Sequence, residues 1–164
     1  MKADLSKKYK SRRRGVLQQA NKLHKLDALF ISDRTDIRYL TGCTEGGSGL
    51  LLGRGVEILY AGKMFEEIIP KEAPGIEVIV PKKAVYAEAS TVLNRHINRR
   101  ALGFQGNILN WAQYQSLEKL MKRRKLVNVG DLVINYRGVK DVDEIKLIRK
   151  CVSIAEREIG RAHV

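Results

Sequence analysis

Histidine and cysteine, the side chains best suited to metal binding or nucleophilic chemistry, are few and scattered in this chain. There are three histidines, His24, His96 and His163, and two cysteines, Cys43 and Cys151. None of them forms an HExxH motif, a paired-cysteine motif or a cluster at metal-ligand spacing. His24 and His96 stand near basic residues in predicted helices, where a surface or helix-end position explains them. The sequence therefore predicts no metal site within the chain, and two reduced, partly buried thiols.

Glycines and carboxylates likewise form no recognisable catalytic arrangement. The stretch 46–49, GGSG, does not match the GxSxG pattern of a serine nucleophile, and neither GxGxxG nor GxxxxGK[ST] occurs. A tight loop before a strand is the better interpretation of these glycines. Asp141, Asp143 and Glu144 are explained by capping of a helix and by its dipole. The residues alone predict a folded domain without a self-contained active site.

Length and composition indicate one folded domain. The chain has 164 residues, of which 44% are hydrophobic and 30% charged. No apolar run approaches the ~20 residues that span a membrane. The first sixteen residues, MKADLSKKYKSRRRGV, lead into no apolar core, so they do not resemble a secretory signal. We therefore expect a cytoplasmic protein.

The net charge of +13 admits two interpretations. The cations gather in two clusters, made of Lys7, Lys8, Lys10, Arg12, Arg13 and Arg14, and of Lys122, Arg123, Arg124 and Lys125. Such clusters are typical either of solvated helix ends or of a nucleic-acid surface. Few aromatic residues lie among them, so no platform for base stacking is evident. Solvated helix ends are favoured, and a stand-alone basic nucleic-acid-binding α/β module is the alternative.

Hydrophobic periodicity predicts strands alternating with helices. We expect helices over 10–25, 63–70, 83–98, 111–123 and 141–157, and strands over 27–32, 50–52, 56–60, 76–80, 101–104 and 125–129. Residues 32–36 resemble a turn, followed by a short semi-apolar stretch at 37–40. The pair of runs around Gly53-Arg54-Gly55 predicts a β-hairpin. This order predicts an α/β domain with a mixed sheet.

Helix-end signals refine these boundaries. Asn110 with Gln113, and Asp141 with Glu144, resemble capping boxes. The helix that follows Asn110 is expected to bury an apolar stripe made of Trp111, Tyr114, Leu117, Leu120 and Met121. Pro70 is expected to end the helix before it. The last predicted helix, 141–157, has an apolar stripe, and no later segment of the chain could pack against it. This suggests that the chain stops early.

The carboxyl-terminal residues 158–164, EIGRAHV, resemble the translation of a common sequencing adapter. On this interpretation they are not natural sequence and take no part in the fold. The alternative is a natural helix end, with Gly160 just beyond the helix and Arg161 near its last carbonyl groups.

Four stretches, taken together and in order, resemble one family. They are 11–32 (SRRRGVLQQANKLHKLDALFIS), 36–52 (DIRYLTGCTEGGSGLLL), 102–120 (LGFQGNILNWAQYQSLEKL) and 132–156 (LVINYRGVKDVDEIKLIRKCVSIAE). The second is similar to a family pattern (N/D)-I-R-Y-L-T-G, and the fourth to V-K-(D/S)-x-x-E-I-x-x-I-R. This family comprises the Xaa-Pro aminopeptidases, prolidases and creatinases.

The resemblance implies the following architecture. Residues 1–138 would form a creatinase/prolidase-type amino-terminal domain with a ribonuclease-H-like mixed sheet flanked by helices. Residues 139–157 would be the junction and first helix of a truncated "pita-bread" catalytic domain, and 158–164 the adapter artefact. In the family that second domain holds two divalent metal ions, often manganese, through two Asp, one His and two Glu, and cleaves before proline. None of those ligands is expected in this chain, which would itself not be catalytic and would carry no cofactor.

The family's amino-terminal domain makes dimer or tetramer contacts and leans over a neighbouring active site, so the resemblance implies a homo-oligomeric parent acting on proline-containing peptides. The matching rim is Asp36, Arg38 and Tyr39: Asp36 would meet a substrate amino group and Arg38 a carboxylate. In the alternative interpretation Asp36 caps a turn, Arg38 is solvated and Tyr39 lies in the core. The chain departs from the family at 61–64, AGKM, and at Cys43, so its subfamily and the activity of its parent stay open.

Overall fold

A computed structural model describes residues 2–96, 101–121 and 124–162 of the chain. The chain divides into two compact units, Met1–Ile134 and Asn135–Val164, which are described separately. The predicted helix ends at 97–98 and 122–123, with Lys122 and Arg123 of the second basic cluster, lie outside the described residues, as does His163.

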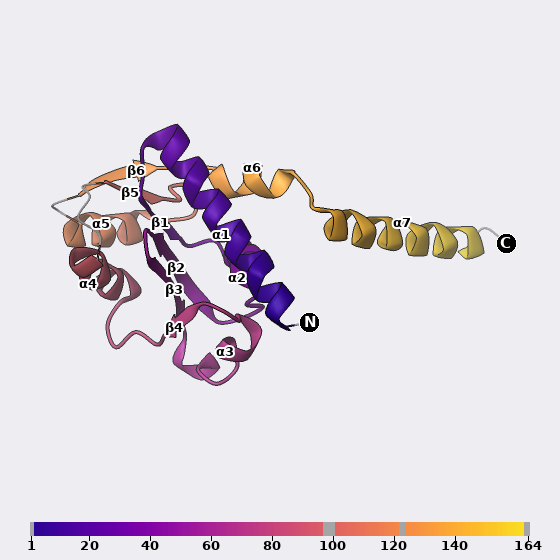
Figure 1. Ribbon diagram of the computed structural model, residues 1–164, viewed down its shortest axis with the longest axis horizontal. Coiled ribbons are helices and arrows are strands. Elements are labelled where there is room, and N and C mark those ends of the chain that lie inside the picture. The colour runs from indigo at the N-terminus through magenta and orange to yellow at the C-terminus, as the bar shows by residue number, and fades with distance from the viewer. Residues whose placement is uncertain (1, 97–100, 122–123, 163–164) are drawn as a thin grey trace. The chain divides into compact units, whose positions relative to one another are not determined.

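A mixed six-stranded sheet forms the centre of the first unit (Figure 1), as predicted. The strands are β1 (Ala28–Ile31), β2 (Gly47–Gly53), β3 (Val56–Ala61), β4 (Glu77–Ile79), β5 (Ala101–Phe104) and β6 (Lys125–Asn128), in the order β4-β3-β2-β1-β5-β6. β2 runs antiparallel to both β1 and β3. β5 pairs in parallel with β1 and β6, and β4 pairs in parallel with β3.

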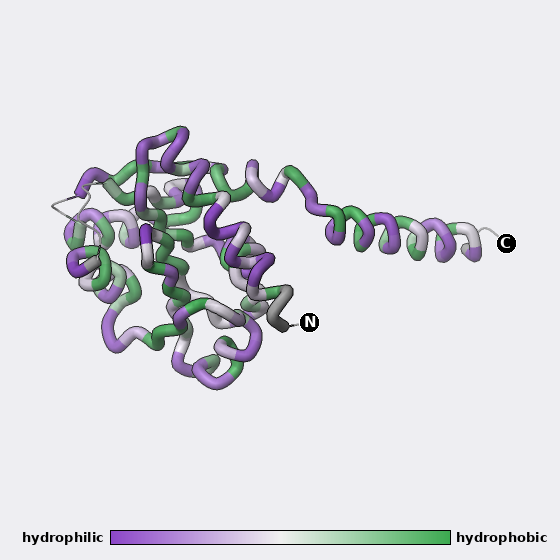
Figure 2. Tube along the Cα trace, viewed as in Figure 1, coloured by the Kyte–Doolittle hydropathy of each residue, from purple (hydrophilic) through white to green (hydrophobic). Residues whose placement is uncertain are grey.

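Helices cover both faces of this sheet. Within the first unit they are α1 (Lys2–His24), α2 (Arg34–Thr41), the 3-10 turn η1 (Lys63–Phe65), α3 (Ile69–Glu72), α4 (Val85–His96) and α5 (Trp111–Leu120), and α6 (Leu132–Gly138) follows β6. α1 and α2 lie on one side of the sheet, and α4 and α5 on the other (Figure 1). The hydrophobic residues concentrate on the central strands, whereas the helices carry polar residues along their outer sides (Figure 2). Because helices cover both faces, β1 is buried along its whole length, which explains its continuous apolar run.

The predicted hairpin is confirmed, with a shorter turn than expected. Gly53 pairs with Val56, so Arg54 and Gly55 alone make the turn, and Gly55 takes a left-handed φ of 74° that favours glycine. The sequence predicted a loop over 46–49. From Gly47 onward this prediction is wrong, because β2 begins at Gly47 and pairs there with the end of β3.

Two other local predictions are wrong. Residues 32–36 do not form a plain turn: Asp33 caps α2 by accepting a hydrogen bond from the Asp36 backbone N–H at 2.8 Å, and the helix runs to Thr41. Pro70 does not end a helix but lies in the first turn of α3, where a missing N–H costs nothing. Nor did the sequence patterns predict α6.

The other helix-end predictions are largely confirmed. Asn110 and Gln113 form a capping box at the start of α5, with both hydrogen bonds at 2.9 Å. Trp111, expected on the buried stripe of that helix, is instead 70% exposed.

The second unit contains α7 (Val142–Ala162). Asp141 and Glu144 cap it reciprocally through two 2.9 Å hydrogen bonds, as predicted. The helix continues through Gly160, so the alternative interpretation, in which Gly160 lies just beyond its end, is wrong. The adapter interpretation of 158–164 stays a prediction.

Candidate functional site

The candidate site lies where β1 and β5 end side by side. β1 leads into α2 on one face of the sheet, whereas β5 leads towards α5 on the opposite face. Such a reversal of connections is where open α/β sheets form a crevice beyond the strand ends. In this chain, protein side chains fill that position.

Gln105, the residue directly after β5, occupies this crevice. Its Oε1 accepts hydrogen bonds from the backbone N–H groups of Ser32 (2.8 Å) and Asp33 (3.0 Å). Its Nε2 donates to Oδ2 of Asp36 at 2.7 Å. Gln105 and Asp36 are 1% and 0% exposed, so this polar contact is fully buried. The sequence patterns did not single out Gln105, although a polar residue directly after a buried strand was a usable signal.

The three predicted rim residues share α2 but point in different directions. Positions 36 and 38 are separated by about 200° around a helix. Accordingly Asp36 is buried against Gln105, whereas Arg38 is exposed. Tyr39 is half-buried beneath Arg12 of α1. The guanidinium carbon of Arg12 lies 4.0 Å from the centroid of the Tyr39 ring. The contacts with substrate assigned to these residues stay predictions.

A second tie joins the loop after α2 to α3. The Thr44 backbone N–H and hydroxyl donate to the Glu72 carboxylate at 2.9 and 2.8 Å. These bonds, the backbone one first, lower the pKa of Glu72, and the positive charge of Arg38 adds to the effect. Arg38 and Glu72 therefore border the same edge of the domain.

Both cysteines are free thiols, in different surroundings. Cys43 is buried, as expected, and its Sγ donates to the Glu45 carbonyl oxygen at 2.9 Å. Burial raises the pKa of this thiol and the nearby Glu72 carboxylate raises it further, so Cys43 is protonated near neutral pH and is a poor nucleophile. Cys151 is exposed on α7, so the expectation of a partly buried thiol is wrong there.

The first basic cluster is only partly a solvated helix surface. Arg13 is 1% exposed and pairs with Glu57 at 2.8 Å, while Arg12 packs on Tyr39. For Arg13 the predicted solvated position is wrong, because its guanidinium is satisfied inside the domain. Contacts within the domain therefore explain these two cations without a bound nucleic acid. The nucleic-acid alternative stays a prediction.

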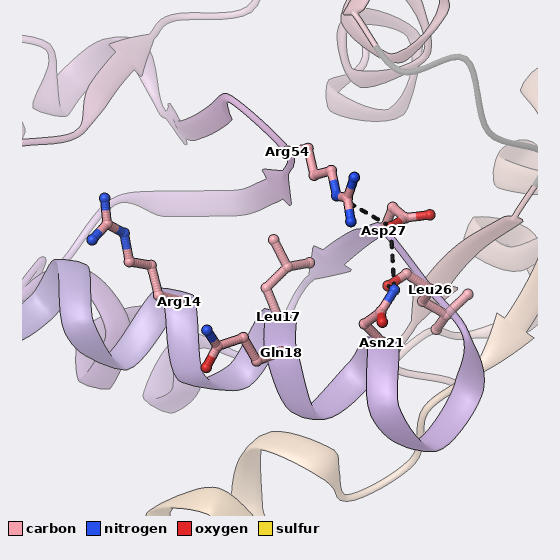
Figure 3. Close-up of a pocket in the computed structure, with 7 residues that line it drawn as sticks. All are labelled: Arg14, Leu17, Gln18, Asn21, Leu26, Asp27 and Arg54. Atoms are coloured by element: carbon pink, nitrogen blue, oxygen red, sulfur yellow. Dashed lines mark hydrogen bonds and ion pairs between the residues drawn. The ribbon is translucent and has the colours of Figure 1, made fainter.

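A surface groove of about 450 Å³ runs between α1 and the turn of the hairpin (Figure 3). It is lined by Arg14, Leu17, Gln18, Asn21, Leu26, Asp27 and Arg54. Its one carboxylate, Asp27, accepts from Asn21 Nδ2 at 3.2 Å and lies 3.6 Å from Nε of Arg54. Asn21 and Arg54 thus hold the Asp27 carboxylate from α1 and from the hairpin turn.

Neither a metal-binding cluster nor a membrane-spanning helix occurs in the part of the chain that the structure describes. Within residues 2–96, 101–121 and 124–162, no group of three or more His, Cys, Asp or Glu side chains could hold a metal ion. In the same ranges, no helix has the length and apolar character needed to cross a bilayer.

Comparison with known proteins identifies the domain. The creatinase/prolidase N-terminal domain family matches residues 13–139. The chain belongs to this family. The creatinase/prolidase N-terminal domain thus contains all six strands of the sheet.

Relatives of this creatinase/prolidase domain are peptidases of greater length. An uncharacterised peptidase, YqhT, of Bacillus subtilis is 29% identical over 133 residues, which cover 80% of this chain and 37% of the relative. A Xaa-Pro dipeptidase of Pyrococcus furiosus is 23% identical, with 84% of this chain and 38% of the relative covered. The chain therefore spans well under half the length of these curated relatives.

Solved structures share the fold. A Xaa-Pro dipeptidase from Bacillus anthracis superposes with a TM-score of 0.80 at 18% identity, over 95% of this chain and 42% of that structure. The N-terminal domain of the cytoplasmic peptidase PepQ from Mycobacterium tuberculosis superposes with a TM-score of 0.69 at 22% identity, over 76% of this chain and 97% of that domain. The predicted α/β fold with a mixed sheet is confirmed.

Proposed function

We propose that this protein is the non-catalytic amino-terminal domain of a metal-dependent Xaa-Pro peptidase, in which it contributes to oligomerisation and limits access to the active site. One observation carries the proposal: the family domain matches residues 13–139, yet the chain covers only 37% and 38% of two peptidase relatives. In the proposed architecture 1–138 form this domain and 139–157 lead into the catalytic domain. Residues 158–164 would lie outside the natural sequence.

The apolar face of α7 supports this architecture. Ile145, Ile148, Val152 and Ile159 recur on one side of the helix and are 39%, 48%, 50% and 63% exposed. A helix with such a stripe is stabilised when another element covers it. We assign the covering surface to a catalytic domain of the parent, because the peptidase relatives extend well beyond the matched region.

Arg38 and Tyr39 are the residues through which the domain would meet a peptide. Arg38 is exposed on α2, and its planar guanidinium is suited to binding a carboxylate through two hydrogen bonds. Tyr39 is half-buried, and Arg12 packs over its ring. Asp36 completes the proposed rim; its carboxylate faces Gln105 here, so direct contact with a substrate amino group would require that bond to open.

The metal ions, subunit state and location of the parent belong to the same proposal. Two divalent ions, manganese in the first instance, would be bound by the catalytic domain, because the described residues of this chain offer no fitting group of ligands. The proposed parent is a cytoplasmic homodimer that acts on proline-containing peptides. Two similar proteins, the Xaa-Pro dipeptidase of Pyrococcus furiosus and the cytoplasmic peptidase PepQ of Mycobacterium tuberculosis, support this assignment.

Sequencing the DNA beyond codon 157 is the direct test. We expect an open reading frame that encodes a second domain with two Asp, one His and two Glu as metal ligands. The full-length product should hydrolyse Xaa-Pro peptides when manganese is supplied, and should elute as a dimer in size-exclusion chromatography with light scattering. A natural stop codon directly after codon 157, or a full-length product without Xaa-Pro hydrolysis, would contradict the proposal.

Replacing Arg38 in that full-length protein tests the rim. Arg38→Ala should lower kcat/KM for a proline-containing tripeptide by about tenfold, because one charge-assisted contact is lost. Arg34→Ala is the matched control, since Arg34 is also exposed on α2 but outside the proposed rim. Equal kinetics of the two variants would remove Arg38 from the rim.

A further inference from the structure

One amide side chain joins three groups on the segment that follows β1. Gln105 accepts from two consecutive backbone N–H groups, those of Ser32 and Asp33, and donates to the carboxylate of Asp36. Asp33 is the N-cap of α2, and Asp36 lies in its first turn. Gln105 therefore binds both the entrance and the first turn of α2 from the neighbouring strand β5.

The chemistry of this position requires an amide. Its oxygen end must accept two hydrogen bonds, and its nitrogen end must donate to a buried carboxylate. Glutamate has the same shape and could still accept from the two N–H groups, but it would place a second carboxylate against Asp36. Leucine is of similar size but would leave both N–H groups and the carboxylate without this partner. When glutamate replaces Gln105, these groups keep their partners only if Asp36→Asn is introduced as well, because the introduced amide can donate to the new carboxylate.

The opposite end of α2 has its own attachments. Arg12 donates from Nη1 to the Tyr39 carbonyl oxygen at 3.1 Å, and Arg13 donates from Nη1 to the Leu40 carbonyl oxygen at 3.1 Å. These contacts come from α1 and hold the carboxyl-terminal turn of α2. Gln105 is the complementary attachment at its beginning, so α2 is fixed at both ends.

We propose that Gln105 is the positioning residue of α2: it closes the crevice between β1 and β5 and fixes the direction in which Arg38 and Tyr39 point. The anchoring role rests on the contacts of Gln105 alone. Its consequence for peptide access rests on the proposed function.

The test uses four variants of the 164-residue chain at neutral pH. Gln105→Glu and Gln105→Leu should each raise the unfolding equilibrium constant at least about 30-fold, because buried polar groups lose their partners. Asp36→Asn should change it less than about fivefold, since the oxygen of the introduced amide can still accept from Gln105. The exchanged double variant, Asp36→Asn with Gln105→Glu, should return to within about fivefold of the parent, which general damage to the core would not do.

Amide hydrogen exchange separates anchoring of α2 from overall stability. In the parent, the Ile37 amide donates a hydrogen bond to the Asp33 carbonyl oxygen. In Gln105→Leu its exchange rate should rise at least about tenfold more than the change in the global unfolding constant explains. Leu51 in the β2–β3 ladder should follow global unfolding alone. The exchanged double variant should restore protection of Ile37.

Failure of the exchanged variant to rescue Gln105→Glu would overturn the proposal, as would unchanged exchange of Ile37 in Gln105→Leu. If Gln105→Glu does not fold, folding of the double variant supports the proposal and its failure to fold contradicts it. None of these measurements uses peptidase activity, so their outcome is independent of the test of the proposed function.

Discussion

Arg13 joins four segments of the domain through one guanidinium group. It belongs to α1 and binds Glu57 of β3, the Leu40 carbonyl oxygen of α2 and the Gly75 carbonyl oxygen before β4. These partners lie far apart along the chain, with Glu57 44 positions away. A single buried cation therefore brings distant segments together, although in the sequence it looks like any member of a basic run.

Replacing Arg13 should destabilise the domain strongly. Arg13→Ala removes the partner of Glu57 and of two carbonyl groups, and we expect a loss of about 3 kcal/mol in the free energy of unfolding. Glu57→Gln, which keeps an accepting oxygen, should cost less than about 1.5 kcal/mol. Urea denaturation measures both, and a loss under about 1 kcal/mol for Arg13→Ala would show that the contacts contribute little.

Glu72 is the acidic residue whose titration reports the tie between Thr44 and α3. Its pKa is lowered in the folded state, so the stabilisation it supplies is present above its unfolded pKa and is lost as the pH falls through its folded pKa. A carbon-detected NMR titration should give a Glu72 pKa below the ordinary glutamate value. Thr44→Ala should raise this pKa part of the way, because the hydroxyl bond is lost while the hydrogen bond from the backbone N–H of residue 44 remains. An unchanged pKa in that variant would rule out the hydroxyl as a cause.

At the scale of elements, helix ends are the features that local sequence predicted best. The capping boxes at Asn110 and Asp141 involve residues only three positions apart, so their geometry depends on the helix itself. The same local reasoning placed Trp111 on the buried side of α5, although it is 70% exposed. Which side of a helix meets the sheet depends on the packing of the whole layer.

The cap of α5 gives a prediction at this scale. Asn110→Ala should reduce the free energy of unfolding by about 1 kcal/mol, because the Gln113 backbone N–H loses its acceptor. Asn110→Ser keeps a capping oxygen and should stay close to the parent protein. Thermal unfolding followed by circular dichroism compares the two variants, and equal losses would argue against the cap as the source of the effect.

At the scale of the whole molecule, the chain combines a buried sheet with a separate helical unit. The residues with the lowest exposure lie between Arg13 and Val133, whereas the described side chains of α7 are largely exposed. The free energy of folding from apolar burial is therefore concentrated in the first unit. Removing residues from the second unit should therefore affect the stability of the protein less than removing residues from the first.

A chain that ends at Gly138 tests this division. It should unfold with a midpoint within about 3 °C of the 164-residue chain, because the buried residues of the first unit all precede Gly138. Ile148→Lys with Val152→Lys in the full chain is a matched variant that removes the apolar stripe and keeps the length. A midpoint lowered by about 10 °C or more in the shorter chain would mean that α7 stabilises the first unit.

The sequence by itself determined the α/β class, the hairpin, most strand positions and two helix caps. It also carried the ordered motifs that resemble the creatinase/prolidase family. These features depend on residues near one another in the chain, such as a run of β-branched and apolar residues or a cap and the third residue after it. Side-chain identity and spacing are sufficient for them.

Only the tertiary structure decided that 34–41 form a helix, that Arg13 is buried, and that Gln105 holds Asp36. The last contact joins residues 69 positions apart, and its worth depends on burial that no local pattern reports. The free energy of a polar group depends on its surroundings: an unpaired group costs little in water and much in a core. That is why the sequence proposed Asp36 as a residue facing a ligand, while the folded chain directs its carboxylate towards Gln105.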